Sequence, residues 1–379
     1  MDEVVASLQS VLRRAAAERY PLCIRGGGTK DFYGGERRGA VLDTKPLRGI
    51  VSYEPTELVI TARAGTPLRE LEAALLEKGQ HLPFEPPHFD YQPEPVAQTP
   101  PEDGEPTISA RPPEQKIATL GGCIAAGLSG PRRAYAGAAR DFVLGVRILD
   151  GRGNELRFGG EVMKNVAGYD VSRLTVGALG TLGVILDVSL KVLPVAPAET
   201  TLRLAVGPDE AIKLMNEWAG KPLPVTATAY RAGTLSVRLA GAPAAVSAGA
   251  KMIGGDAMAP DQAPRFWIDL REHRTPFFAG DQPLWRLSVK STTPPLDLDG
   301  PQIIEWGGAL RWLRSDADPG RIRDAAAQAG GHATLFRAGH KAAPAFHSLS
   351  PALARVHRRL KEAFDPAGIL NPGRLYPDF

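Results

Sequence analysis

The sequence has few cysteines, few histidines and no long apolar run. Its 379 residues contain two cysteines, Cys23 and Cys123, and seven histidines. Two thiols exclude a disulfide scaffold, a four-thiolate zinc site and an iron–sulfur cluster ligated by this chain alone. No apolar run approaches the roughly 18 residues of a membrane-spanning helix. The start carries acidic residues and no apolar segment, so it does not resemble a secretory signal, and we expect a cytoplasmic protein.

Charge and composition narrow the class of protein further. Lysine and arginine number 45 against 42 aspartates and glutamates, which gives a formal net charge of +3. Nucleic-acid partners are not expected, because the chain lacks the basic excess that neutralises a phosphate backbone. Glycine (41) and proline (34) make up about a fifth of the residues, below the roughly 25–30% of low-complexity chains. The length predicts two globular domains, or three, rich in tight turns.

Apolar spacing predicts two helices in the first eighty residues. Their buried faces comprise Val5, Leu8, Leu12 and Ala15 in the first helix and Leu68, Leu71 and Leu75 in the second. Thr66 is expected to cap the second helix, because a threonine hydroxyl accepts a hydrogen bond from a free N–H group. Pro67 then stands at the first helical position, where its missing N–H group is tolerated.

A proline-rich, acidic segment interrupts the first domain between residues 86 and 113. It holds nine prolines in 28 residues, together with five acidic residues. Such a composition buries too little apolar surface to offset the entropy lost on ordering. We therefore expect an exposed insertion between two elements of one domain.

The pattern changes after Pro197. Predicted strands and helices follow one another in the order strand, helix, strand, strand, helix, and a similar mixture of strands and helices continues to residue 335. This order predicts a separate α+β unit in which an antiparallel sheet carries helices on one face. Trp306 and Trp312 stand on a predicted hairpin of this unit, as core residues or as an aromatic partner surface. The last residues read as a helix that ends before Pro366, followed by turns.

A glycine turn follows the first predicted strand. The segment Arg25-Gly26-Gly27-Gly28-Thr29 can adopt positive φ angles and expose consecutive backbone N–H groups. Such a nest binds phosphate anions, although the same glycines also suit an ordinary tight turn. The segment is not a Rossmann fingerprint, because Asp31 stands where that motif requires glycine.

Two further glycine-rich turns stand at element edges in the same half of the chain. Thr119-Leu120-Gly121-Gly122, with Gly127 behind it, precedes a predicted helix of small residues, and Gly177, Gly180 and Gly183 precede a long apolar strand. Three such turns indicate a large ligand that is contacted mainly by backbone. A dinucleotide with a pyrophosphate fits that description.

The glycine turns belong to a longer series of motifs. The series is Ile24–Thr29, Ala64–Thr66, Leu82-Pro83, Ala118–Gly122, Asp141–Gly145 with Asp150-Gly151, Gly168–Asp170, Gly177–Ile185 and Phe364–Gly373. In this order it resembles the FAD-binding domain of the vanillyl-alcohol oxidase and p-cresol methylhydroxylase superfamily. Segments such as LPFEPPHF, GLSGPRRAYAG, KNVAGYDVSRL, IEWGGALRWL and FDPAGILNPGRLY are similar, within that superfamily, to the FAD-binding subunits of glycolate oxidases.

This resemblance implies an α+β fold with three parts. Residues 1–196 would form a PCMH-type FAD-binding domain of two subdomains, with the insertion 86–113 inside it. Residues 197–335 would form a ferredoxin-like α+β cap domain, and residues 336–379 would return to the FAD-binding domain.

The resemblance also assigns the FAD contacts. The turn Gly26–Thr29 would hold the pyrophosphate, and Thr119, Gly121 and Gly122 would line the pyrophosphate and ribityl chain. The backbone of Gly183–Ile185 would face the adenine, and Asn371 would approach the isoalloxazine. The full expected set is Arg25, Gly26, Gly27, Gly28, Thr29, Pro83, Thr119, Gly121, Gly122, Gly127, Gly183, Val184, Ile185 and Asn371.

The mode of FAD attachment follows from two residues. Some relatives carry histidine at the position of Thr29 and attach FAD through it. Threonine cannot form that bond, so we expect non-covalent FAD. Cys123 could suggest a thioether link instead, but we interpret it as a small buried thiol.

The sequence offers little for catalysis. Related dehydrogenases of 2-hydroxy acids place a His-x-His metal motif in the cap domain, whereas the seven histidines here form no such pair. We therefore expect no metal site. His340, with Arg337 and Lys341 nearby, is the remaining candidate for a base that takes the hydroxyl proton, and a surface histidine in a basic turn is the alternative.

The resemblance implies a subunit rather than a complete enzyme. Its partners would be a homologous FAD-containing catalytic subunit and an iron–sulfur subunit, with a small 2-hydroxy acid as substrate of the complex. This chain would have a structural or electron-relay role, peripheral to the inner membrane through the complex. Two alternatives stay open: a stand-alone FAD-dependent 2-hydroxy-acid dehydrogenase, and a scaffold whose FAD is redox-silent.

Overall fold

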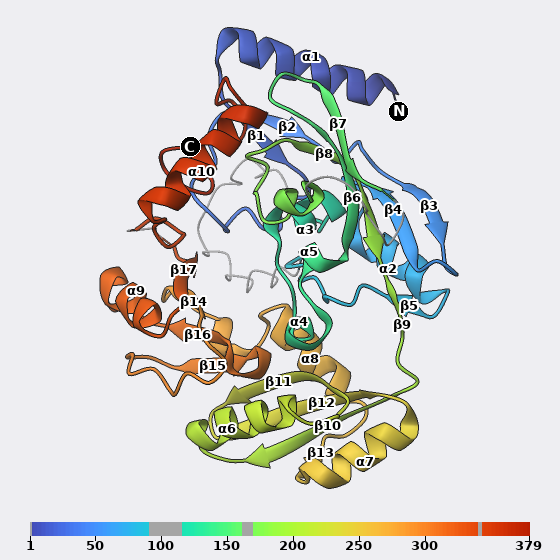
Figure 1. Ribbon diagram of the computed structural model, residues 1–379, viewed down its shortest axis with the longest axis vertical. Coiled ribbons are helices and arrows are strands. Elements are labelled where there is room, and N and C mark those ends of the chain that lie inside the picture. Colours follow the sequence, from blue (N-terminus) through green and yellow to red (C-terminus); the bar gives the residue numbers. More distant parts are fainter. Residues whose placement is uncertain (1, 91–115, 161–169, 340–342) are drawn as a thin grey trace, which may run out of the picture.

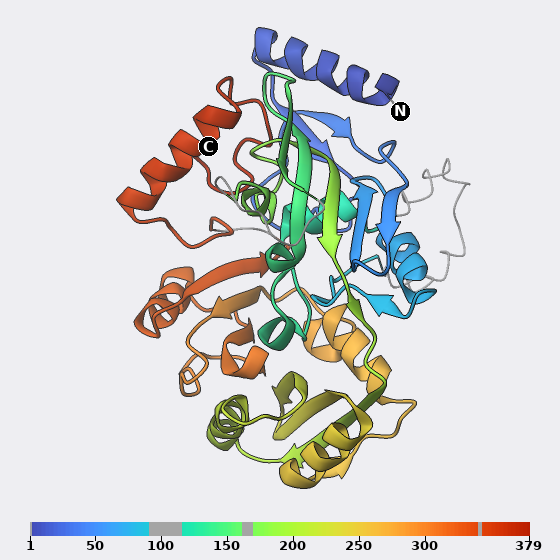
Figure 2. The same cartoon turned by 45° about the vertical axis from the view of Figure 1, so that its right-hand side comes forward.

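The computed structural model describes residues 2–90, 116–160, 170–339 and 343–379. Their elements form an N-terminal α+β region, a second α+β region on one large sheet, and a C-terminal segment (Figure 1). Both ends of the chain lie at one end of the molecule, and the large sheet lies at the other (Figures 1 and 2). The C-terminal helix therefore returns to the region in which the chain began.

The N-terminal region combines short helices with a mostly antiparallel sheet. Its elements are α1 (Asp2–Glu18), β1 (Leu22–Arg25), β2 (Ala40–Asp43), β3 (Ile50–Glu54), β4 (Val59–Arg63), α2 (Leu68–Leu76), β5 (Gln80–His81), α3 (Leu120–Ala126), α4 (Arg133–Ala136), α5 (Ala139–Phe142), β6 (Val143–Leu149), β7 (Glu155–Gly159), the 3₁₀ turn η1 (Ser172–Thr175), β8 (Val184–Lys191) and β9 (Leu193–Pro194). In the described residues a five-stranded sheet has the order β3-β4-β8-β6-β7, and β1 pairs with β2 in parallel.

The first two helices lie as the apolar spacing predicts. Helix α1 buries Val5, Leu8, Leu12 and Ala15, and α2 buries Leu68, Leu71 and Leu75. The expected cap of α2 is wrong, however. Pro67 is the N-cap residue and makes no side-chain cap. The Thr66 hydroxyl instead hydrogen-bonds with the backbone of Gly49, where it accepts from the N–H group at 2.9 Å. A tertiary contact therefore takes the hydroxyl that local sequence assigned to the helix.

The second region is built on an eight-stranded sheet, counted over the described residues. Its elements are β10 (Ala198–Ala205), α6 (Pro208–Ala219), β11 (Val225–Arg231), β12 (Thr234–Gly241), α7 (Pro243–Ile253), β13 (Asp256–Ala257), α8 (Ala263–Arg271), η2 (Pro276–Phe278), β14 (Leu284–Ser288), β15 (Gln302–Glu305), η3 (Trp306–Gly308), β16 (Leu310–Arg314), α9 (Pro319–Gln328) and β17 (His332–Arg337). The strand order is β13-β10-β12-β11-β15-β16-β14-β17, and its pairs are antiparallel.

The two faces of this sheet have different partners. Helices α6 and α7 share a core with β11 and β12, and α9 packs against β14 and β17. The opposite face packs on α8 and on the N-terminal region through Tyr33, Leu128 and Leu179. The expectation that the helices lie on one face is therefore wrong for α8. Trp306 and Trp312 are buried in this second core, which confirms that they are core residues.

The C-terminal segment begins with α10 (Pro351–Phe364), which ends before Pro366 as predicted. Lys361 of α10 is buried, and its ammonium group contacts Asp365 at 2.7 Å and the carbonyl oxygens of Thr181 and Leu370. Leu370 also forms a parallel bridge with Leu22 of β1. The segment after α10 is thereby tied to both the first strand and the turn before β8.

The expected exposed insertion begins differently in the structure. Pro86, Pro87 and His88 are buried, and the Glu272 carboxylate accepts hydrogen bonds from the backbone N–H groups of His88 and Phe89. Composition could not show this contact, because its acceptor lies 184 residues away. Residues 91–113 of the expected insertion lie outside the described residues.

Candidate functional site

The candidate site is a cavity of about 790 Å³ in the N-terminal region. Its wall is formed by the end of β1 and the glycine turn behind it, the start of α3, the turn before β8, and the C-terminal tail. The lining residues include Arg25, Gly26, Gly27, Gly28, Thr29, Thr119, Gly121, Gly122, Gly183, Ile185 and Asn371. The structure thus brings the three glycine turns and the tail together around one space, whose size is usual for a cofactor site.

Three residues of the expected set are not part of this wall, and the structure gives them other contacts. Val184 is fully buried and packs in the core under α1, because successive side chains of a strand point to opposite faces. Gly127 ends α3 in a left-handed conformation (φ 63°), with Gly177 so close that a Cβ would lie 2.9 Å from it. Pro83 is buried between Leu82 and Phe84, two residues of the core under α2.

The glycine turn after β1 presents free donors. Among the described residues, no hydrogen bond is donated by the backbone N–H groups of Gly26, Gly27, Gly28 or Thr29. Gly28 has a positive φ of 75°, and the Gly27 carbonyl accepts from the N–H group of Ile117 at 3.2 Å. Consecutive backbone N–H groups without a protein partner form a nest for an anion, so this row of them at a cavity wall indicates an anionic ligand.

The start of α3 supplies space rather than donors. Thr119 caps the helix by accepting a hydrogen bond from Gly122 at 3.3 Å, and the N–H groups of Leu120 and Gly121 donate to Thr66 and Ala64. A Cβ on Gly121 would stand 2.7 Å from the Cβ of Ala64. The helix can therefore approach β4 closely, and its small residues leave the cavity open.

Asn371 fixes the opposite wall. Its side-chain oxygen accepts a hydrogen bond from the N–H group of Ile24 at 2.7 Å, and its side-chain nitrogen donates to the Leu179 carbonyl at 2.6 Å. The residue has a positive φ of 42°, which asparagine tolerates better than most residues. Asn371 thus holds the first strand, the turn before β8 and the tail in one arrangement.

The wall also holds cations that the sequence analysis did not single out. Lys30, Arg37 and Arg374 line the cavity. The guanidinium group of Arg374 donates to the carbonyl of Gly35, and Arg37 pairs with Asp31 at 3.0 Å. Burial lowers the pKa of Lys30, whose ammonium group donates to the Thr29 hydroxyl at 3.3 Å. Proximity to the turn could have suggested Lys30 and Arg37, but Arg374 becomes visible only once the tail is placed.

The two residues that bear on covalent attachment lie in different environments. Thr29 lines the cavity and is 7% exposed. Cys123 is fully buried in the core under α2, outside the cavity wall, and burial raises the pKa of its thiol to about 12. A thiol in that state is neutral and unreactive, which fits its interpretation as a core residue.

The remaining expectations concern metals, membranes and His340. In the part of the chain that the structure describes, no group of three or more histidine, cysteine, aspartate or glutamate side chains could hold a metal ion. None of the described helices combines the length and apolar character that crossing a bilayer requires. His340 lies outside the described residues.

Free backbone donors, nearby cations and an apolar remainder suit a dinucleotide with a pyrophosphate, so the residues present fit FAD. Known protein families agree with this chemistry. A family model described as "FAD binding domain" matches residues 3–92, and one described as "FAD linked oxidases, C-terminal domain" matches residues 340–375. These matches confirm the FAD expectation.

Solved structures agree on the fold. Alkyldihydroxyacetonephosphate synthase is similar with a TM-score of 0.60 at 16% sequence identity, over 96% of this chain and 75% of that chain. At that identity the likeness speaks for the fold alone, and it confirms the α+β class expected for an FAD-linked oxidase.

Curated relatives define the family. The chain is 46% identical over 372 residues to the glycolate oxidase subunit GlcE of Escherichia coli (strain K12), which covers 98% of this chain and 97% of the relative. It is 29% identical over 209 residues to the glycolate oxidase subunit GlcD of Bacillus subtilis (strain 168), over 53% of this chain and 39% of that protein. A D-lactate dehydrogenase of Archaeoglobus fulgidus is 28% identical over 58% of this chain and 44% of its own length. The chain therefore belongs to the GlcE family of FAD-linked oxidoreductase subunits.

Proposed function

We propose that this chain is the FAD-binding subunit of a multi-subunit glycolate oxidase and holds FAD non-covalently in the cavity described above. The observation that carries the proposal is the row of free N–H groups from Gly26 to Thr29 in a chain 46% identical to GlcE. FAD, when bound, supplies a two-electron acceptor. The division into residues 1–196, 197–335 and 336–379 is part of the same proposal.

The chain's own residues bind and orient this cofactor. The turn Gly26–Thr29 binds the pyrophosphate through backbone donors, and the neighbouring cations Lys30 and Arg374 offset its negative charge. Gly183 and Ile185 border the adenine end. Asn371 positions the tail beside the isoalloxazine by its two hydrogen bonds to Ile24 and Leu179.

The role of the subunit is structural or that of an electron relay. Its partners are a homologous FAD-containing catalytic subunit and an iron–sulfur subunit, and the complex oxidises a small 2-hydroxy acid. The missing His-x-His motif and the lack of a metal cluster among the described residues support this division of labour. So does the similarity to GlcD, which identifies a second, related type of glycolate oxidase subunit. Any attachment of this chain to the inner membrane is mediated by the other subunits of the complex.

Kinetics of the assembled complex test this role. Glycolate is mixed anaerobically with the complex, and reduction of this subunit's flavin is followed in time against turnover. A relay predicts reduction at a rate equal to or above turnover. Flavin that stays oxidised during turnover would leave a redox-silent scaffold. A complex that turns over normally without this chain would refute the proposal as a whole.

The competing function is a stand-alone dehydrogenase with His340 as base. Steady turnover of glycolate or D-lactate by the purified chain alone would establish it. Loss of that turnover in His340→Gln, with FAD retained, would assign the base.

A further inference from the structure

Helix α10 lies on the outside of the molecule and buries little of its own surface (Figures 1 and 2). Of its fourteen residues only Lys361 is buried, whereas α1 buries four apolar side chains. A surface helix ordinarily packs its apolar stripe against the core of its own chain. The apolar stripe of α10 therefore does not serve the packing of this chain in the usual way.

The apolar residues of α10 form a narrow seam. Leu353, Val356, Leu360 and Ala363 follow one another at intervals of three, four and three residues, which places them in one row along the helix. This is the a/d spacing through which one helix packs on another. Leu353 is 52% exposed and Val356 59% exposed, Ala363 is exposed, and Leu360 is half-buried. Most of the seam is thus uncovered.

The neighbouring face of α10 fixes the helix on the rest of the chain. The ring of His357 lies 5.8 Å from that of Tyr376, centre to centre, and Lys361 contacts Asp365 at 2.7 Å. Phe364 packs against the core under α2. These contacts hold α10 in one orientation, and they do so without covering the seam.

Arginines border the exposed seam. Arg359 stands three residues after Val356, and Arg355 stands four residues before Arg359, so the two arginines form a row beside the seam. Both are exposed, and in the part of the chain that the structure describes no carboxylate pairs with either. The whole helix contains four basic residues and one acidic residue. Its exposed surface therefore combines apolar side chains with positive charge.

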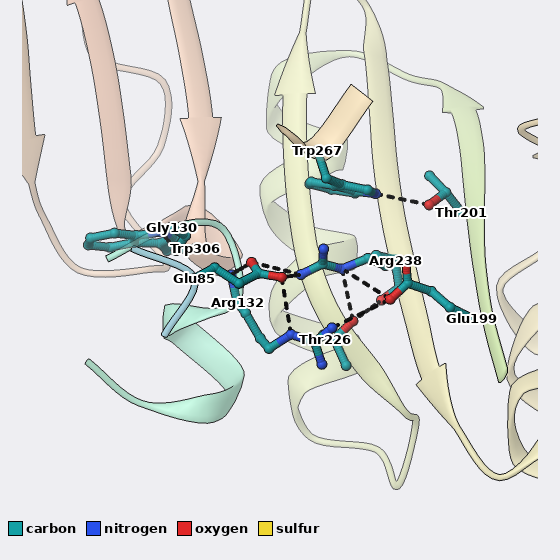
Figure 3. A network of polar contacts seen from close by, with 9 residues as sticks. All are labelled: Glu85, Gly130, Arg132, Glu199, Thr201, Thr226, Arg238, Trp267 and Trp306. Atoms are coloured by element: carbon teal, nitrogen blue, oxygen red, sulfur yellow. Dashed lines mark hydrogen bonds and ion pairs between the residues drawn. The ribbon is translucent and has the colours of Figure 1, made fainter. Parts of the chain in front are cut away.

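Arginines that join parts of this chain have carboxylate partners instead. At the boundary between the two regions, Glu85 accepts a hydrogen bond from Arg238 at 2.8 Å and pairs with Arg132, and Arg132 also pairs with Glu199 (Figure 3). The charges of that network are compensated within the molecule. The arginine row of α10 lacks such compensation among the described residues, so its charge is available to a partner.

Spacing and charge together favour one kind of partner. An apolar centre with arginines at its rim is typical of a protein–protein interface. A second copy of this chain would bring two arginine rows of the same sign together, which is unfavourable. A membrane-lying helix has a broad apolar face, whereas this seam exposes only two large apolar side chains, Leu353 and Val356. A helix with an apolar seam and carboxylates beside it matches both features of α10.

We propose that the exposed seam of α10 is the docking site for a helix of another subunit of the proposed glycolate oxidase complex. That partner helix carries an apolar seam flanked by carboxylates. Leu353 and Val356 pack against its apolar residues, and Arg355 and Arg359 pair with its carboxylates. The proposal rests on the proposed function, which supplies the other subunits, and adds the surface by which this chain joins them.

Binding of the FAD-loaded chain to the other subunits tests this site. The homologous flavoprotein subunit and the iron–sulfur subunit are co-expressed without this chain, purified, and titrated with it by biolayer interferometry. The double variant Leu353→Ser/Val356→Ser should bind at least tenfold more weakly. Unchanged affinity in this variant would overturn the proposal.

The matched control is the double variant Leu76→Ser/Val195→Ser. It also removes one leucine and one valine that are exposed, 67% and 47%, but from the end of α2 and the segment after β9. Because neither residue belongs to the seam, the affinity should change less than twofold. An equal loss in both double variants would mean that exposed apolar surface in general, and not α10, drives the association, which would overturn the proposal.

A charge reversal adds an independent criterion. Arg359→Glu should weaken binding at least tenfold, whereas Arg69→Glu, on the exposed side of α2, should change it less than twofold. Raising the salt concentration from about 50 mM to about 300 mM should weaken binding of the unchanged chain more than binding of Arg359→Glu, because salt screens exposed charges. Equal losses in the two charge variants would contradict the proposed row. Arg359→Glu decides the matter if the double serine variant does not fold.

The other occupants give different results. Binding to vesicles of phosphatidylcholine and phosphatidylglycerol that is lost in Leu353→Ser/Val356→Ser would assign the seam to a membrane, and a dimer of the chain that this variant abolishes would assign it to a second copy. Either result would overturn the proposal. If the unchanged chain binds no other subunit, the proposed function fails and this proposal with it. If the α10 variants bind as the unchanged chain does, only the docking site is refuted.

Discussion

Asn371 and Ile24 are joined by a hydrogen bond of 2.7 Å from the backbone N–H group of Ile24 to the side-chain oxygen of Asn371, although 347 residues separate them. The bond links the strand before the glycine turn to the C-terminal tail. Because the same side chain also contacts Leu179, a single amide fixes three walls of the cavity in which we propose that FAD binds. FAD binding should therefore depend on Asn371 even where it does not touch the cofactor.

Asn371→Ala should lose both hydrogen bonds, each contributing about 1 kcal/mol, and should lower FAD affinity at least tenfold. The matched control is Asn216→Ala in α6. The side-chain nitrogen of Asn216 donates to the backbone carbonyl groups of Ile212, Ser291 and Gly307, so this amide also binds main-chain groups, but it lies outside the cavity. FAD retained on gel filtration and the unfolding midpoint are measured for both variants. Equal FAD retention in the two would contradict the positioning role of Asn371.

Non-covalent FAD predicts complete release of the cofactor when the protein is denatured. Thr29 offers no histidine, and the neutral Cys123 lies in the core under α2, outside the cavity wall. After acid precipitation all flavin absorbance should be in the supernatant and none in the washed pellet. A pellet that stays yellow would mean a covalent bond to another residue of the chain.

The carboxylate of Glu85 should make the stability of the folded chain depend on pH. Burial alone would raise the pKa of Glu85, but Arg238 and Arg132 outweigh it and lower the pKa below 4.5. A carboxyl group with a lowered folded-state pKa contributes stability above its unfolded pKa and loses it as the pH falls through the folded value. Thermal unfolding of Glu85→Gln should therefore show lower stability at pH 7 and a smaller loss below about pH 4.5 than the unchanged chain.

Glu199→Gln is the control for that prediction. Glu199 pairs with the same arginine, Arg132, but its side chain is 36% exposed against 16% for Glu85. Glu199→Gln should lower the free energy of unfolding at pH 7 by no more than about 1 kcal/mol, as for other exposed ion pairs. An effect of Glu199→Gln equal to that of Glu85→Gln would mean that burial does not set the strength of this network.

The buried pair Lys361–Asp365 should anchor the tail. Lys361→Met leaves the Asp365 carboxylate without its cation and should cost about 3–5 kcal/mol of unfolding free energy. Asp365 still accepts from the N–H groups of Ile369 and Leu370. Adding Asp365→Asn should recover part of the loss, since no unpaired charge then remains. Chemical unfolding of the two single variants and the double variant measures the coupling energy between Lys361 and Asp365. Losses of unfolding free energy that simply add in the double variant would contradict a stabilising ion pair.

Sequence patterns correctly predicted those features that depend on residues close together in the chain. The apolar spacing of Leu68, Leu71 and Leu75 found α2 and its buried face, and the three glycine turns indicated a ligand bound by backbone. The assignment of Thr66 as a cap failed because a distant glycine, Gly49, competes for the same hydroxyl. A capping rule takes account only of residues that are close in the sequence.

Contacts between distant segments could not be predicted from the sequence. Arg374 reaches the proposed FAD cavity only because the tail returns to β1. The buried start of the 86–113 segment depends on Glu272 in the same way. Periodicity and composition hold no information on which segments meet.

The most direct test of the account is an absorbance spectrum of the purified chain, recorded before and after anaerobic addition of glycolate. We predict a flavin spectrum that stays oxidised with glycolate alone and bleaches once the partner subunits are added. Bleaching by glycolate alone would show that this chain oxidises substrate itself, against the dependent role proposed here. A chain that carries no flavin and takes up none when FAD is added would contradict the central claim.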